Sequence, residues 1–165
     1  MAEAARVSIP TGTPAFQSFL EANRATVYRF LTVAVGPRDA DDVFQETFLA
    51  ALRAYPRVRE PDKLDRWILA IASRKAIDHH RAAAKRPVPM DDPPERPVHD
   101  PALEDADGPL WRAVRSLPPR QRIAVVHRHV LDRPYREIAE LMGCSEQTAR
   151  ANVYQGTKRL RELMA

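Results

Sequence analysis

A proline-rich acidic segment, residues 87–109, sets the strongest limit on how this chain can fold. It holds seven of the fifteen prolines and seven acidic side chains against one basic one, and large apolar residues are scarce. Such a segment cannot bury enough apolar surface to offset the entropy that it would lose on ordering. We therefore predict an extended linker at 87–109, with one folded unit before it and another after it.

The block before the linker carries the apolar repeat of amphipathic helices. Five glycines among 165 residues are few for a sheet protein, which needs many tight turns. Breaks in the repeat fall at Gly36-Pro37 and at Pro56 and Pro61, because proline cannot continue a helix. We predict three helices here, over about residues 14–35, 39–55 and 62–84.

The helix predicted over 39–55 has two faces of different chemistry. Its first turn is acidic, which suits a helix start because carboxylates there meet the positive end of the helix dipole. The apolar stripe that should face the core is Phe44, Phe48, Ala51, Leu52 and Tyr55. The side chains left on the outer face are Asp41, Asp42, Gln45 and Glu46.

The helix predicted over 62–84 should present a charged, mainly basic stripe to solvent. The side chains spaced to face inward are Leu64, Trp67, Ile68, Ile71 and Ala72. The outer stripe consists of Arg74, Asp78, Arg81 and Lys85. For Trp67, the spacing favours a place in the core over a surface on which a base could stack.

Residues 134–163 carry the sharpest local pattern in the chain. A short apolar helix precedes Gly143, which allows a tight turn, and Ser145 is a favoured N-cap for a second helix. Helix, glycine turn and capped helix predict a helix-turn-helix, whose second helix enters the major groove of DNA. Within that helix, Gly156 should cost about 1 kcal/mol relative to alanine. The side chains placed to meet DNA are Ser145, Gln147, Thr148, Arg150, Ala151, Asn152, Tyr154 and Gln155.

Charge is distributed unevenly along the chain. The net charge is −1 over residues 1–56, +5 over 57–86, −6 over the linker and +6 over 110–165. Two basic blocks separated by an acidic one indicate two polyanion-binding modules on a tether.

Four stretches resemble the sigma-70 family of bacterial RNA polymerase sigma factors. Residues 39–48 (DADDVFQETF) resemble the family's DAEDLVQETF motif in region 2.2, and residues 67–81 (WILAIASRKAIDHHR) resemble its WLYRIARNLAIDHLR helix in regions 2.3 to 2.4. Residues 117–122 (LPPRQR) resemble the start of region 4, and the helix-turn-helix is similar to region 4.2. The resemblance covers about residues 16–86 and 110–163 in the family's order. The lack of a further domain resembles the small extracytoplasmic-function (ECF) group.

This resemblance implies an all-α fold with two small helical domains and a role in transcription initiation. Residues 14–86 would be region 2, a bundle that binds core polymerase and the downstream promoter element. Residues 110–165 would be region 4, whose helix-turn-helix binds the upstream element, with the acidic proline-rich linker 87–109 between them. The expected function is to bind core RNA polymerase and to direct promoter recognition and opening.

The resemblance also implies roles for particular residues and partners. The face that grips the β′ clamp helices of the polymerase matches Asp41, Asp42, Gln45, Glu46 and Phe48. The part that binds and melts the downstream element contains basic residues able to contact phosphates, namely Arg57, Arg59, Lys63, Arg66, Arg74 and Arg81. The implied partners are core polymerase (its β′ clamp helices and β flap), promoter DNA and an anti-sigma protein.

Other classes of function find little support in the residues. The sequence has no nucleophile elbow, phosphate loop or paired catalytic carboxylates, so we expect no enzyme activity, cofactor or small-molecule substrate. The histidines at 79, 80, 127 and 129 and Cys144 lack the spacing of a zinc site, and we expect no metal. The lone cysteine and the lack of an apolar stretch of spanning length predict a cytoplasmic protein without membrane insertion.

Two alternatives fit the residues without the family resemblance. One is a stand-alone helix-turn-helix transcriptional regulator that binds a palindromic DNA site as a dimer, with the N-terminal bundle for oligomerisation or sensing. The other is a helical adaptor whose basic faces bind an acidic protein. The helix-turn-helix by itself does not separate a regulator from a sigma factor.

Overall fold

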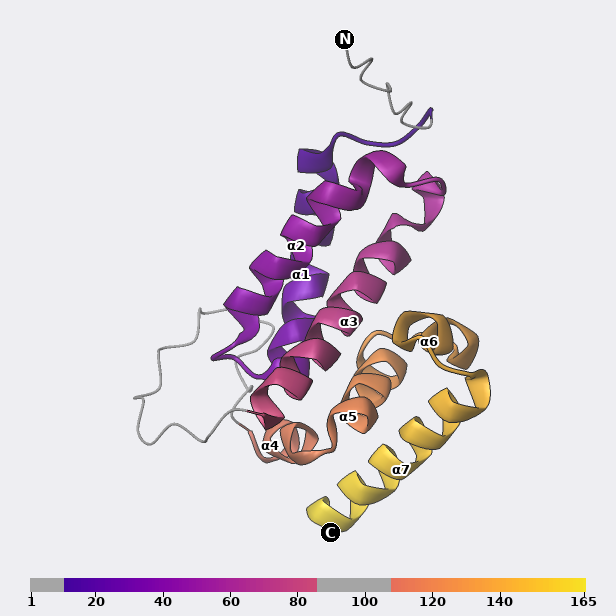
Figure 1. Cartoon of the computed structure of the whole chain (residues 1–165). Coiled ribbons are helices and arrows are strands. Elements are labelled where there is room, and N and C mark those ends of the chain that lie inside the picture. The colour runs from indigo at the N-terminus through magenta and orange to yellow at the C-terminus, as the bar shows by residue number, and fades with distance from the viewer. Residues whose placement is uncertain (1–10, 86–107) are drawn as a thin grey trace.

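The computed structural model describes residues 11–85 and 108–165, and within these stretches all regular secondary structure is helical, as predicted. The predicted linker lies outside the described residues except for its last two positions. Two helical groups lie against each other (Figure 1), which we call the N-terminal group, α1–α3, and the C-terminal group, α4–α7. In the described part of the chain, no helix combines the length and the apolar character needed to cross a bilayer.

The N-terminal group consists of three long helices at nearly the predicted positions. They are α1 (Phe16–Val35), α2 (Ala40–Ala54) and α3 (Leu64–Ala84). Gly36 ends α1 with a φ of 92°, a conformation that glycine adopts without steric cost. Between α2 and α3 the chain forms two short 3₁₀ turns, each with a proline at its first or second residue, η1 (Tyr55–Arg57) and η2 (Pro61–Lys63).

An aromatic cluster fills the end of the N-terminal group where α2 passes into the η1–η2 connection. Phe19 lies at its centre, with its ring centroid 5.1 Å from that of Tyr55 and 5.7 Å from that of Trp67. Phe16 and Phe48 complete the cluster. Trp67 is half-buried there, so its spacing correctly placed it among core residues.

The predicted inner stripe of α2 was wrong at one position. Leu52 is 51% exposed, whereas Thr47 is fully buried. The hydroxyl of Thr47 donates a hydrogen bond to the carbonyl oxygen of Val43 at 2.7 Å, so its polar atom is satisfied inside the core. A stripe drawn through apolar residues alone missed Thr47 and wrongly turned Leu52 inward.

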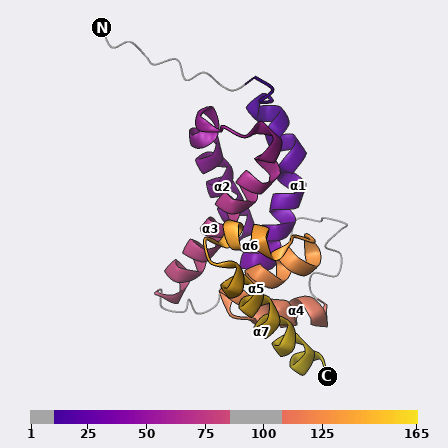
Figure 2. The same cartoon turned by 90° about the vertical axis from the view of Figure 1, so that its right-hand side faces the viewer.

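The C-terminal group contains shorter helices and the predicted helix-turn-helix. Two helices precede the motif, α4 (Pro109–Ser116) and α5 (Pro119–Val125), and a π-helical turn, η4 (Val126–Val130), continues α5. The motif itself is α6 (Tyr135–Met142) followed by α7 (Glu146–Met164). In Figures 1 and 2, α7 lies on the side of this group that faces away from the N-terminal group.

The turn between α6 and α7 has the predicted chemistry. Gly143 adopts the left-handed conformation with a φ of 63°. The Oγ atom of Ser145 accepts a hydrogen bond from the backbone N–H of Thr148 at 3.1 Å, which makes Ser145 the N-cap of α7. The helix-turn-helix prediction is therefore confirmed in its local geometry.

Gly156 has a packing role that its helix propensity does not reveal. It is buried where α7 lies against α5, and a Cβ atom at this position would lie only 2.6 Å from Cγ2 of Val125. The same Cβ would lie 3.3 Å from the backbone oxygen of Gln121. Glycine therefore allows the two helices to approach closely, which offsets the propensity cost predicted for α7.

Gly156→Ala is expected to lower the free energy of unfolding by about 1 kcal/mol, although alanine is the better helix former. Overpacking against Val125 should cost about 1–3 kcal/mol, and the propensity gain is about 1 kcal/mol. Chemical denaturation measures the loss, with the exposed Lys158→Ala as the control on the same helix. Adding Val125→Ala should make the combined loss smaller than the sum of the single losses. A stabilised Gly156→Ala protein would show that α7 has room for the methyl group.

The two groups share one hydrophobic core rather than standing apart. On the N-terminal side the contacts come from α1 and α3, and on the C-terminal side from α4, α5, η4 and α6. Buried apolar residues of both groups form one continuous cluster. The sequence predicted two modules on a tether, and the structure adds that these modules pack directly against each other.

A buried histidine lies in the contact between the groups. His127 of η4 is fully buried, and its ring stacks on Phe30 of α1 with 4.7 Å between the ring centroids. Ser73 of α3 donates its hydroxyl proton to the carbonyl oxygen of Leu69, so its oxygen accepts from Nε2 of His127 at 2.9 Å. The other ring nitrogen, Nδ1, is buried without a hydrogen-bond partner.

Arg122, from the LPPRQR motif, joins the groups at the end of α1. Its guanidinium donates to the carbonyl oxygens of Leu117 and Arg115 in its own group. It also donates to the carbonyl oxygen of Ala34 at 2.8 Å, and Nε2 of His80 lies 2.7 Å from the same oxygen. Burial and the nearby Arg122 lower the pKa of His80, which favours the neutral form of its ring beside the guanidinium.

Candidate functional site

The outer face of α2 brings together most of the residues expected to bind a protein partner. Asp41, Asp42, Gln45 and Glu46 are all exposed. Two leucines extend the same helix surface, Leu49 at 53% exposed and Leu52 at 51%. We call these six residues the α2 surface.

Phe48 does not lie on the α2 surface, although the resemblance grouped it with the binding face. Its side chain is 6% exposed and its ring packs against Phe19 and Phe44. Phe48 can act on the surface only by supporting the helix from below. Leu49 and Leu52 were missed as surface residues, although their positions three to four residues apart beside the exposed acidic residues were the available signal.

The basic residues expected to bind the downstream element differ in their exposure and in their partners. Arg57 and Arg59 are exposed in the connection before η2, and Arg74 and Arg81 are exposed along α3. Lys63 is also exposed, and its ammonium lies 3.2 Å from the carboxylate of Glu60. Arg66 differs from the other five because its guanidinium points toward the C-terminal group.

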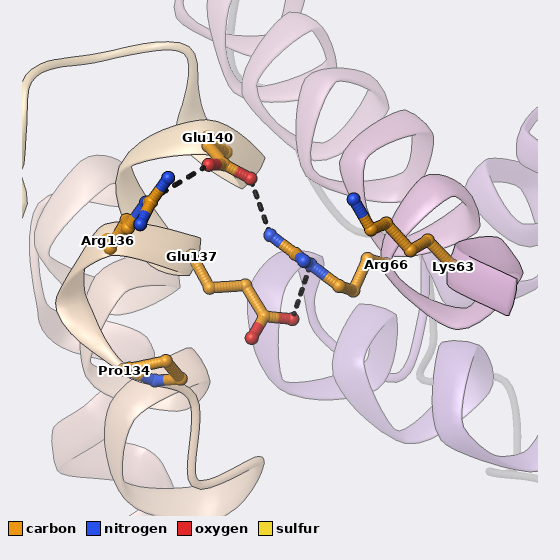
Figure 3. Close-up of a pocket in the computed structure, with 6 residues that line it drawn as sticks. All are labelled: Lys63, Arg66, Pro134, Arg136, Glu137 and Glu140. Atoms are coloured by element: carbon orange, nitrogen blue, oxygen red, sulfur yellow. Dashed lines mark hydrogen bonds and ion pairs between the residues drawn. The ribbon is translucent and has the colours of Figure 1, made fainter. Parts of the chain in front are cut away.

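Figure 3 shows Arg66 between two carboxylates of α6. Its Nε lies 3.2 Å from Oε1 of Glu137, and its Nη2 lies 2.5 Å from Oε2 of Glu140. Lys63, Pro134 and Arg136 line the same open pocket. The sequence did not foresee that a residue expected at DNA would contact the helix-turn-helix.

The first turns of α7 expose the side chains expected to read DNA. Only Asn152 among them is half-buried, with its amide donating to the carbonyl oxygen of Thr148 at 3.0 Å. The hydroxyl of Ser145 is used within the protein, because it caps α7 and donates to Oγ1 of Thr148. The rest of the set is exposed on α7: Gln147, Thr148, Arg150, Ala151, Tyr154 and Gln155.

Arg150 is held in place by two neighbours. Its guanidinium lies 2.7 Å from the carboxylate of Glu146 and 4.5 Å from the centre of the Tyr135 ring. Arg128 lies 4.4 Å from the centre of the same ring. These contacts orient two guanidinium groups beside the start of the helix-turn-helix.

The histidines and the cysteine take separate structural roles. His79 contacts Asp39 at 3.1 Å, and His127 lies in the interdomain core. Cys144 is half-buried in the α6–α7 turn, and burial raises the pKa of its thiol. No group of three or more metal-binding side chains comes together within residues 11–85 and 108–165.

Comparison with known proteins matches two stretches of the chain to family models. Residues 19–86 match the family model described as Sigma-70 region 2, and residues 107–160 match that described as Sigma-70, region 4. The chain is 31% identical to the ECF RNA polymerase sigma factor SigC of Mycobacterium tuberculosis over 144 residues, or 84% of this chain and 77% of SigC. It is also 31% identical to the RNA polymerase sigma factor SigV of Bacillus subtilis, over 74% of each chain.

Solved structures have the same fold at lower sequence identity. The sigma factor RpoE of Bartonella quintana, crystallised with the anti-sigma factor NepR, gives a TM-score of 0.72 at 19% identity, over 90% of this chain and 96% of RpoE. CnrH in complex with the cytosolic domain of CnrY gives 0.65 at 21% identity, over 90% of this chain and 86% of CnrH. With both regions matched and curated relatives at 31% identity, the chain belongs to the ECF group of the sigma-70 family of RNA polymerase sigma factors, which are transcription initiation factors and not enzymes.

Proposed function

We propose that this sigma factor binds core RNA polymerase through the α2 surface and holds two promoter elements with separate parts of the chain. Region 2 comprises residues 14–86, and α3 with the connection before it binds the downstream element. Region 4 comprises residues 110–165, and α7 reads the upstream element, with residues 87–109 as the linker. The observation that carries this proposal is the exposure of the α2 surface on a molecule that also exposes a helix-turn-helix.

The α2 surface has the chemistry to bind basic helices such as the β′ clamp helices. Asp41, Asp42 and Glu46 provide negative charge that would speed association and set the orientation of the partner. Leu49 and Leu52 add exposed apolar area, which stabilises a complex once water leaves the contact. A partly apolar, partly acidic helix face suits a protein partner better than it suits DNA.

Region 4 has the chemistry to bind DNA through α7. Arg150 and Gln155 can make paired hydrogen bonds to base edges, and Arg150 would exchange its contact with Glu146 for one with the base. The basic residues of region 2 would add phosphate contacts, so overall affinity should fall as salt rises. We infer that the downstream element is held by Arg57, Arg59, Lys63, Arg66, Arg74 and Arg81.

The remaining partners follow from the same proposal. RpoE was crystallised with the anti-sigma factor NepR, and we infer that an anti-sigma protein binds this chain as well. A factor that acts on RNA polymerase and chromosomal promoters works in the cytoplasm. The polymerase β flap would bind region 4, and catalysis would reside in the polymerase alone.

Run-off transcription with core polymerase tests this function. Promoter-specific transcripts should appear only when the protein is added, and Asp42→Arg should reduce them by roughly tenfold or more, because reversing a charge at a polar interface opposes docking. The fold should stay intact, since Asp42 is exposed. Glu21→Arg makes the same charge change on the exposed side of α1 and should leave transcript levels near those of the wild type.

Two outcomes would contradict the proposal. Tight protection of a palindromic DNA site without polymerase would favour the stand-alone regulator. Failure to associate with core polymerase at low ionic strength would exclude the polymerase-dependent role altogether, since weak screening favours charged contacts.

A further inference from the structure

The contact between α3 and α6 is charged, in contrast to the apolar core beside it. Arg66 of α3 bridges Glu137 and Glu140 of α6, at 3.2 Å and 2.5 Å (Figure 3). Arg133, in the segment before α6, bridges in the reverse sense to Asp65 of α3 at 3.2 Å. Each helical group thus contributes both an arginine and a carboxylate to the contact.

Glu137 joins these pairs into one network. Its carboxylate contacts Arg133 at 2.9 Å as well as Arg66, and its side chain is only 12% exposed. Arg133 is 21% exposed and Arg66 is 32% exposed. Partly buried, connected ion pairs are screened less by solvent than isolated surface pairs. This network therefore stabilises the contact between α3 and α6 more than the same pairs would if each were isolated on the surface.

Arg66 contacts the carboxylates of Glu137 and Glu140 in the way that an arginine contacts the oxygens of a phosphate. A guanidinium presents several N–H donors in one plane, which match a pair of anionic oxygens from either a carboxylate or a phosphate. Glu137 and Glu140 fill two of the directions in which Arg66 can donate. A phosphate cannot make the same contacts while α6 is in place.

We propose that Glu137 and Glu140 hold Arg66 in the place of promoter phosphates, and that this network latches region 4 onto region 2 in the isolated protein. The inference rests on the proposed function in one respect, because it takes Arg66 as a DNA contact. Promoter DNA and α6 then compete for the same guanidinium. The closed arrangement in Figure 1 is a self-inhibited state that binds DNA weakly until the two groups separate.

The closed and open states differ in which charged groups are free to bind a partner. Closing satisfies Arg66 and Arg133 within the protein and buries His127 against Phe30 and Ser73. Opening exposes these groups but frees Arg66 for DNA. A partner that binds only the open protein, such as polymerase or promoter DNA, shifts the population by its difference in affinity for the two states.

A charge exchange tests the latch without using DNA. Fluorophores attached to cysteines introduced as Ala22→Cys and Lys158→Cys, both exposed positions, in a Cys144→Ser background, report the separation of the two groups. Arg66→Glu should raise the ratio of open to closed protein about fivefold, since it places three carboxylates together. Adding Glu140→Arg should return the ratio toward that of the parent protein. An unchanged ratio in Arg66→Glu would overturn the latch.

DNA binding tests the inhibition. The probe is a 30-base-pair duplex of arbitrary sequence at low salt, and the variant is Glu140→Lys, at a side chain that is 57% exposed. Glu21→Lys makes the same charge change on α1 and corrects for the general gain in positive charge. Glu140→Lys should bind about fivefold more tightly than Glu21→Lys. Equal affinity of the two variants would show that α6 does not compete with DNA.

The two experiments separate failure of the latch from failure of the proposed function. Transcripts that depend on this protein, combined with equal DNA affinity of Glu140→Lys and Glu21→Lys, would retain the sigma function and reject the inhibition. Loss of the closed state in Arg66→Glu, combined with no polymerase-dependent transcription, would retain the interdomain contact and reject the function on which inhibition depends.

Discussion

Replacing Phe19 by alanine is expected to lower the free energy of unfolding by about 3–5 kcal/mol. Phe19 is 2% exposed and its ring contacts those of Phe48, Tyr55 and Trp67. Deleting it removes a buried aromatic side chain and leaves a cavity lined by rigid rings that cannot collapse easily.

The effect should reach function because the cluster supports two proposed binding regions. Phe48 lies beneath the α2 surface, and Tyr55 and Trp67 flank the η1–η2 connection. Removing the Phe19 ring should therefore weaken both polymerase binding and downstream DNA binding. Region 4 should keep its local structure.

Chemical denaturation measures the loss, and Phe19→Leu is the matched comparison. Leucine retains most of the apolar volume, and we expect it to cost about 1–2 kcal/mol. An alanine variant that loses less than leucine, or no more than the exposed substitution Glu21→Ala, would show that the aromatic cluster does not stabilise the N-terminal group.

Lowering the pH from 7 to 5 is expected to destabilise the protein by about 2 kcal/mol through His127 alone. Burial, with a smaller contribution from the positive charge of Arg133, lowers the pKa of His127 to about 3. In the unfolded chain the group titrates near pH 6.5. The folded state therefore holds a neutral ring under conditions in which the unfolded chain takes up a proton.

The sign follows from the direction of this shift. Because the unfolded chain binds more protons, stability is complete above about pH 6.5 and is lost as the pH falls from there toward 3. The geometry agrees, because Nε2 already donates to Ser73 and a proton on Nδ1 would find no acceptor. Since Phe30 and Ser73 belong to region 2, acid should also favour separation of the two groups.

Denaturant unfolding at pH 7 and pH 5 checks this prediction. His127→Gln does not titrate, so its loss between the two pH values should be smaller than that of the wild type by about 2 kcal/mol. The comparison uses the difference between proteins, because His80 also has a lowered pKa and adds to acid destabilisation in both. The exposed substitution His129→Gln is the control and should keep the wild-type loss. Equal losses in the wild type and His127→Gln would exclude His127 as the cause.

Features that depend on neighbouring residues were predictable from the sequence. The three N-terminal helices begin and end within about two residues of their predicted bounds. The α6–α7 turn was predicted down to its cap, because a glycine at positive φ and a serine N-cap act within one turn of the chain. The matched motifs then identified the family.

Predictions failed where burial depended on more than the apolar pattern of a single helix. Leu52 was placed inward by its apolar character, although Thr47 takes the buried position by bonding to its own backbone. Gly156 was seen as a weak helix residue, and only the approach of Val125 explains it. In both cases the apolar pattern of one helix did not show which of its side chains the neighbouring helices would cover, or how closely those helices would approach.

By itself, the sequence determined the helices, the helix-turn-helix, the family and the separation of charge along the chain. These properties depend on local conformational propensity and on short sequence motifs. Only the tertiary structure decided that the two groups close on each other, with Arg66 held by α6 and His127 buried against Phe30. The physical reason is that contacts between residues more than fifty positions apart depend on how whole helices pack, which no single stretch of sequence specifies.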